Sequence, residues 1–145
     1  KISGPLLDRI DLQVHVPRVD ISRALGTKTD SNASHKPNQK TPSSETVKAL
    51  VSKAQDLQFS RQGCLNAGLN NNELGKFASL STQNQTFITH AIDTLGLSMR
   101  AFHRTLKVSR TIADLDSSND IHKQHISEAL SYRNFDKLLK QLSGN

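Results

Sequence analysis

From residue 43 onward the apolar residues recur three or four positions apart, which is the spacing of one face of an α-helix. Residues 43–45 (SSE) suit a helix start, because serine side chains accept hydrogen bonds from the first backbone N–H groups. The apolar face of this first helix would consist of Val47, Leu50, Val51, Ala54 and Leu57. Repeated amphipathic segments of this kind predict a mainly α fold, a small helical bundle over residues 43–145.

Turn and capping residues divide the rest of this region. Residues 61–72 predict a loop, and a short helix follows over 72–78. Thr82 and Gln85 form a capping-box pair that would open the next helix, and Gly96 would close it. Ser98 would cap a long helix that ends near Leu115, before a turn over 116–120. Two more helices are expected, one with Ile126, Ala129 and Leu130 and a last one with Phe135, Leu138, Leu139 and Leu142.

The first 42 residues follow other patterns. Apolar residues at positions 10, 12, 14 and 16 alternate with polar ones, which predicts a short strand that ends at Pro17. Residues 26–42 hold one alanine as their only hydrophobic residue, so they predict a flexible, disordered linker. The strand would have no sheet to join, and a lone strand is not stable in water. We therefore expect residues 1–42 to be largely unstructured.

Bulk properties limit the partners and the location. The chain has 145 residues and a net charge of +6, from 19 Lys and Arg against 13 Asp and Glu. Such a charge favours anionic partners, although a soluble domain with a merely basic bias fits equally well. Its single cysteine, Cys64, suits a reducing, cytoplasmic location. No run approaches the about 20 apolar residues that span a bilayer, so no membrane partner is expected.

The long helix predicted after Ser98 carries its charge on one side. At 100° per residue, one face is apolar and the other is mostly basic. This polar face could reach a phosphate, follow a nucleic-acid backbone, or simply face solvent. Arg100 stands out because it lies in the first turn, where the helix N-terminus also favours an anion. The polar face comprises Arg100, His103, Arg104, Lys107, Arg110, Thr111 and Asp114.

Two kinds of site are not expected in this chain. Gly75 and Lys76 are followed by Phe77 rather than by Ser or Thr, so no phosphate-binding P-loop is present, and the chain alone should bind no ATP or Mg²⁺. His122 and His125 lie three positions apart without a Cys or acid at ligand spacing, so we interpret them as ordinary surface histidines and expect no metal site.

Two segments carry a family resemblance. Residues 3–17 (SGPLLDRIDLQVHVP) and 96–115 (GLSMRAFHRTLKVSRTIADL) resemble, in this order, two motifs of the bacterial magnesium-chelatase-like AAA+ ATPases. Shorter matches lie at 61–67 and 128–133, so that the resemblance runs from residue 3 to about residue 135. Because the chain opens directly on such a motif without an initiating Met, we expect it to be the C-terminal piece of a longer protein.

The resemblance implies roles for individual residues. It divides the chain into a remnant of the ATPase core (residues 1–25), the linker (26–42) and a helical lid (43–145). Arg9 matches the arginine finger, which would reach the γ-phosphate held by a neighbouring subunit, and Arg100 matches the second-sensor arginine. Arg104, Lys107 and Arg110 would face phosphate or nucleic acid. ATP and Mg²⁺ would be bound by the upstream core of the full-length protein, as part of a homohexamer.

Three functions remain open. The first is the lid and sensor part of an AAA+ motor that remodels DNA, in a helicase-like activity during DNA uptake or recombination. The second is the motor subunit of a true magnesium chelatase. The third is a stand-alone DNA-binding module that uses the basic helix face. The form of the two motifs favours the first function.

Overall fold

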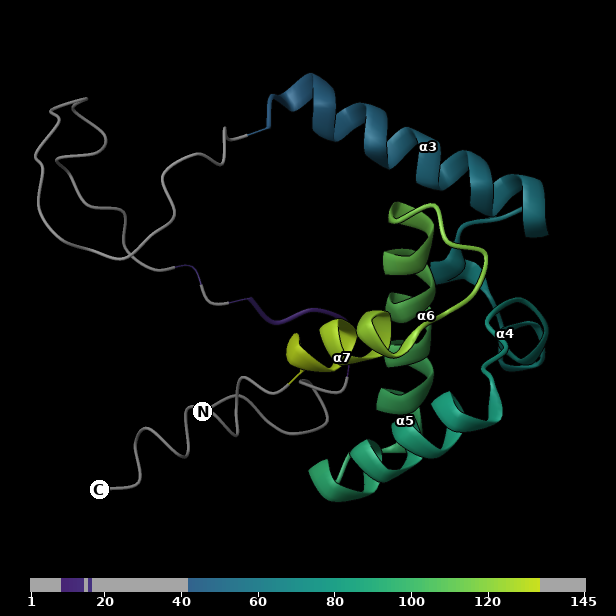
Figure 1. Ribbon diagram of the computed structural model, residues 1–145, viewed down its shortest axis with the longest axis vertical. Helices are drawn as coiled ribbons and strands as arrows, with labels where there is room; N and C mark the ends of the chain where they lie inside the picture. The colour runs from purple at the N-terminus through teal and green to yellow at the C-terminus, as the bar shows by residue number, and fades with distance from the viewer. Residues whose placement is uncertain (1–8, 15, 17–41, 134–145) are drawn as a thin grey trace, which may run out of the picture.

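The structure, a computed structural model, describes residues 9–14, 16 and 42–133. This part contains five α-helices and one 3₁₀ helix, and no strand is assigned in it (Figure 1). The predicted mainly α bundle is therefore confirmed. The elements are α3 (Ser44–Gln62), η1 (Asn66–Gly68), α4 (Asn71–Phe77), α5 (Thr82–Leu95), α6 (Met99–Leu115) and α7 (Lys123–Ser131).

Helix α6 lies at the centre of the bundle. It contacts α3, η1, α4 and α7, while α5 packs on α7. In Figure 1, α6 stands upright, α3 crosses near its C-terminal end, and α5 runs below its N-terminal end. No helix in the described ranges is long and apolar enough to cross a membrane.

The core forms where the apolar faces of α4, α5, α6 and α7 meet. Burial of such faces is what stabilises short helices that would be marginal alone. Partly buried side chains, among them Phe87 and Phe102, pack around this core. The buried cluster consists of Leu69, Leu74, Ala78, Ile88, Ile92, Leu106, Ala113, Ile121, Ile126 and Leu130.

Capping residues set most helix boundaries as predicted. Ser43 and Ser98 are N-caps, whose hydroxyl oxygens accept hydrogen bonds from Thr46 N–H and Ala101 N–H. Gly96 ends α5 in the left-handed region, at φ 62°. One prediction was wrong: α5 is capped by Ser81, which accepts from Asn84 N–H, rather than by Thr82. A serine at the preceding position supplies the same acceptor, and a capping motif alone does not distinguish the two.

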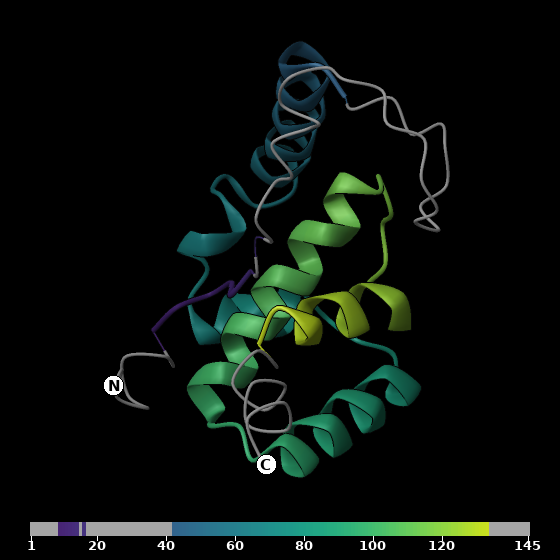
Figure 2. The same ribbon diagram turned by 90° about the vertical axis from the view of Figure 1, so that its left-hand side faces the viewer.

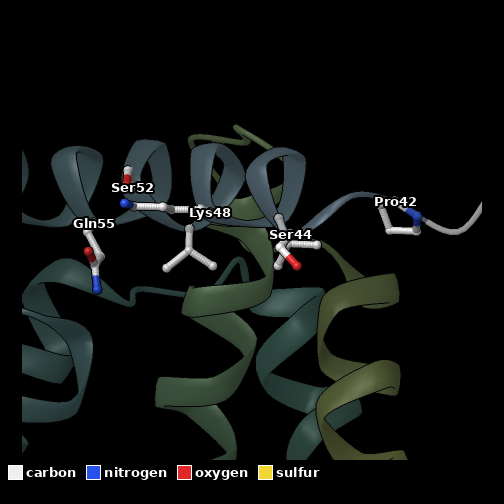
Figure 3. A pocket seen from close by; sticks show the side chains of 7 residues that line it. Pro42, Ser44, Lys48, Ser52 and Gln55 are labelled. Carbon is white, nitrogen blue, oxygen red and sulfur yellow. The ribbon is translucent and has the colours of Figure 1, made fainter.

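Helix α3 differs from its prediction. It continues to Gln62, five residues past Leu57, and so includes the start of the expected 61–72 loop. Of the predicted apolar face only Ala54 is buried, whereas Val47 and Leu50 are 45% and 50% exposed. The cause is geometric, because the N-terminal half of α3 extends past α6 (Figure 1). An open hollow under this half is lined by Pro42, Ser44, Val47, Lys48, Val51, Ser52 and Gln55 (Figure 3).

The expected strand at the start of the chain is a second correction. Residues 10–14 and 16 are not in a strand, since a strand needs a neighbouring strand to complete its hydrogen bonds. Instead, the N–H of Gln13 donates to the carbonyl oxygen of Tyr132, at 2.9 Å. Residues 9–14 thus run along the bundle and are not free of it. Residues 1–8, 15 and 17–25 of the predicted core remnant, residues 26–41 of the predicted linker and the last predicted helix lie outside the described residues.

Candidate functional site

The N-terminal end of α6 presents Arg100 to solvent. Ser98 caps the helix, and Arg100 follows in the first turn, where the helix dipole favours an anion. The side chain of Arg100 is exposed and makes no hydrogen bond or ion pair with any residue in the described ranges. Its guanidinium therefore keeps its donors available for a ligand.

One turn further on, Arg104 is engaged with the start of the chain. Its Nη1 donates to the backbone carbonyl oxygen of Arg9, at 2.6 Å, and to the carboxylate of Asp11. Lys107, on the same side of α6, donates through Nζ to the carbonyl oxygen of Ala67 in η1, at 2.8 Å. Both cations are half-buried and contact the protein itself, so the polar face is less open than its sequence suggests.

Arg110 is buried, with 3% of its side chain exposed. Its Nη2 lies 3.0 Å from Oδ1 of Asp114, one turn later in α6. Nη1 and Nη2 also donate to the carbonyl oxygens of Asn119 and Ser118, at 2.8 and 2.6 Å. Because it is buried, Arg110 is not accessible to phosphate or nucleic acid, in contrast to the expectation from the helical wheel.

Asp114 is the centre of a buried polar cluster. Its carboxylate is 1% exposed and accepts from Arg61 at 2.6 and 3.0 Å, and from the side-chain amide of Asn66 at 2.8 Å. Burial lowers the pKa of Arg110, while the nearby Asp114 carboxylate opposes this shift and favours the charged form. The cluster joins the end of α3, η1 and the last turns of α6, and its role is structural.

Sequence reasoning missed this cluster. The helical wheel places Asp114 on the mostly basic polar face of α6, but it cannot show what packs on that face from elsewhere in the chain. Its partners Arg61 and Asn66 lie 53 and 48 residues away. The available signal was the match of residues 61–67 to the family, which marks the region without stating its contact.

His125 is a further correction, because it is buried rather than on the surface, with 1% of its side chain exposed. Its Nδ1 accepts the backbone N–H of His122, at 3.0 Å, and thus caps α7. Its Nε2 lies 3.2 Å from Asp116 Oδ2. Within the described part of the chain, no three His, Cys, Asp or Glu residues gather as a set of metal ligands.

The two arginines singled out by the motifs lie on neighbouring parts of the molecule. Arg9 is exposed, and its side chain makes no hydrogen bond or ion pair with the described residues. Its carbonyl oxygen, however, is held by Arg104, which lies one helical turn from Arg100. The structure thus brings the Arg9 backbone close to the exposed end of α6.

Comparison with known proteins gives the same assignment as the motifs. A sequence model of the family described as "Magnesium chelatase, subunit ChlI C-terminal" matches residues 41–133. Over 99% of the chain, 38% of its residues are identical to Competence protein ComM of Haemophilus influenzae. Over 98% of the chain, the identity is 41% to Uncharacterized protein YifB of Escherichia coli and 38% to that of Salmonella typhimurium.

The chain spans 26% of the length of each of these relatives. The matched region contains every described helix from α3 to α7, including the exposed Arg100 and the buried cluster around Asp114. It covers well over half of the chain. The chain therefore belongs to the magnesium-chelatase-like AAA+ proteins, and its helical domain is a member of the family described as the C-terminal part of magnesium chelatase subunit ChlI.

Proposed function

We propose that this chain is the lid and sensor part of an AAA+ ATPase, in which Arg100 contacts the nucleotide phosphates and Arg9 acts as an arginine finger toward a neighbouring subunit. ATP and Mg²⁺ would be held by the rest of the full-length protein, assembled as a homohexamer. The support for a longer parent protein is that the relatives are about four times as long as this chain.

The observation that carries the proposal is the difference between Arg100 and the other cations of α6. Arg104, Lys107 and Arg110 each donate to groups of the chain itself. Arg100 has no such partner among the described residues and stands at a helix N-terminus. An exposed guanidinium of this kind suits a phosphate, because its N–H groups can donate to two phosphate oxygens at once.

Arg9 supports the same proposal from the other side. Its side chain is exposed, while its backbone is fixed by the hydrogen bond from Arg104. A finger arginine needs this combination, because a free guanidinium stabilises the transferred phosphoryl group only if its backbone is held in place.

The substrate that we propose is DNA, remodelled at the cost of ATP hydrolysis. The relatives reported above support this choice over a true magnesium chelatase, since one of them is named a competence protein. The positive net charge of the chain is also consistent with an anionic substrate.

The central test is turnover by the full-length protein. Arg9→Ala and Arg100→Ala should each lower kcat for ATP hydrolysis by about 10³-fold or more, the range seen when a finger arginine is removed. Lys53→Ala is the matched control, because Lys53 is exposed on α3 and lies far along the chain from both residues. An unchanged kcat in either arginine variant would remove that arginine from the mechanism.

A second test uses this chain alone. We expect no micromolar ATP binding by isothermal titration, because the chain carries no phosphate-binding loop. Binding of a DNA duplex at low salt would favour the alternative of a stand-alone DNA-binding module. Such binding should weaken steeply as salt rises.

A further inference from the structure

Four hydrogen bonds join residues 9–14, hereafter the Arg9 segment, to the helical bundle. Two come from Arg104, which donates to the carbonyl oxygen of Arg9 and to the carboxylate of Asp11. A third comes from Arg133, whose Nη2 donates to the carbonyl oxygen of Ile10 at 3.1 Å. The fourth joins Gln13 N–H to the carbonyl oxygen of Tyr132. More than 90 residues of chain separate each pair of partners.

These contacts involve α6 and the residues at the end of α7. Arg104 lies on α6, whereas Tyr132 and Arg133 directly follow α7. Figures 1 and 2 both show the Arg9 segment, in purple, running beside these two helices. Because α6 and α7 pack closely on each other, the segment is attached to a part of the bundle in which both helices meet.

The chemistry of the contacts favours a stable attachment. Arg133 is only 9% exposed, so its hydrogen bond to Ile10 is protected from water. The charged guanidinium of Arg104 donates to a carboxylate and to a carbonyl oxygen. Hydrogen bonds that involve charged groups are stronger than those between neutral groups. By contrast, the apolar side chains of the segment contribute little, since Leu12 and Val14 are 49% and 64% exposed. The attachment is therefore mostly polar.

We propose that Arg104 is a positioning residue, which together with Arg133 fixes the Arg9 segment to α6 and α7, so that Arg9 follows the movements of the lid. This inference rests on the proposed role of Arg9 as the finger, but the attachment itself does not. It assigns to Arg104 a task different from contact with phosphate or nucleic acid, which its place in the basic face had suggested.

The attachment is tested first on this chain, through hydrogen exchange of the Gln13 amide. Arg104→Gln and Asp11→Asn each break the same ion pair from opposite sides, and each should speed the exchange of this amide by about tenfold. Asp11 is 58% exposed at its side chain, so its replacement leaves the bundle folded. Lys53→Gln, which removes one exposed charge elsewhere, should leave the exchange unchanged. Wild-type exchange in both variants of the pair would overturn the proposal.

The positioning role is tested in the full-length protein. Arg104→Gln should lower kcat for ATP hydrolysis by about 10²-fold while the KM for ATP stays the same, because a displaced finger weakens only the transition state. Arg104→Lys, which keeps one charged donor, should recover part of this loss. A normal kcat in Arg104→Gln, together with an inactive Arg9→Ala, would overturn the positioning role. A normal kcat in Arg9→Ala would instead refute the proposed finger, and the Gln13 exchange would still decide the attachment.

Discussion

Arginine side chains at the two ends of α6 have opposite environments. Arg100, in the first turn, is exposed and has no partner in the described part of the chain. Arg110, ten residues later, is buried against Asp114 and two backbone carbonyls. Both are arginines of one polar helix face. Their difference shows that the segments packed on the helix, rather than its own periodicity, decide which cations stay free to bind.

The energetics of the two ends differ accordingly. Asp114 accepts hydrogen bonds from Arg61, Asn66 and Arg110, and these replace the hydrogen bonds that its carboxylate would make with water. A buried carboxylate or guanidinium without such partners would cost several kcal/mol, roughly the stability margin of a small domain. Arg100 remains hydrated and incurs no such cost. The C-terminal end thus serves stability, whereas the Arg100 side chain at the N-terminal end stays in contact with solvent.

The largest effect that separates the two ends should come from Asp114→Ala. This change leaves the buried Arg110 without its carboxylate partner, so we expect a loss of about 3–5 kcal/mol in the free energy of unfolding, measured by urea denaturation. Arg100→Ala should change it by less than about 0.5 kcal/mol, because its side chain is exposed. Equal losses in the two variants would show that the ends of α6 do not differ as described.

A smaller effect is expected at the free end itself. Ser98→Ala removes the acceptor for Ala101 N–H and should destabilise the chain by about 1 kcal/mol in the same assay. Ser98→Asp keeps an acceptor and adds a favourable charge at the helix N-terminus, so it should restore most of this loss. If Ser98→Asp were as unstable as Ser98→Ala, the cap would not be the reason for the loss.

The smallest effect concerns an exposed pair that contrasts with the buried one. The hydroxyl of Tyr132 donates to the Glu128 carboxylate at 3.0 Å, and this bond raises the pKa of Tyr132. A pKa raised by folding means that the stabilisation is present below about pH 10, the unfolded value, and is lost as the pH rises through the folded pKa. Tyr132→Phe should therefore be slightly less stable than the wild type at pH 8, and the gap should close above pH 10.

Thermal unfolding at a series of pH values would measure that gap. Solvent screens this exposed pair, so the difference should be far smaller than that for Asp114→Ala. A gap that widened with pH would contradict the assigned direction of the pKa shift.

Local signals in the sequence predicted most of the helices. Ser43, Ser98 and Gly96 act where their side chains or backbone predicted, because capping depends only on neighbours a few residues away. The family was also predicted correctly from its two motifs. These are the features that the chain encodes over short distances.

The other errors mostly concern contacts that lie beyond the local sequence pattern. The partners of Asp114 come from α3 and η1, and the path of the Arg9 segment depends on Arg104 and Arg133. For α3 the periodicity predicts the helix correctly, but it does not tell how far the neighbouring helix extends, and most of the predicted apolar face is exposed. The role of Arg100 stays a prediction, now supported by its lack of a partner in the described residues.

The turn after α6 has a consequence for how this domain can vary. Ser117, at φ 55°, reverses the chain so that the next two carbonyl oxygens point to Arg110. The carbonyl oxygen of Ile121 then accepts from the side chain of Asn84, at 2.8 Å. Exposed loops usually accept inserted residues, but here an insertion would take these acceptors away from their donors. Across homologues, this connection should keep a constant length wherever Arg110 is present.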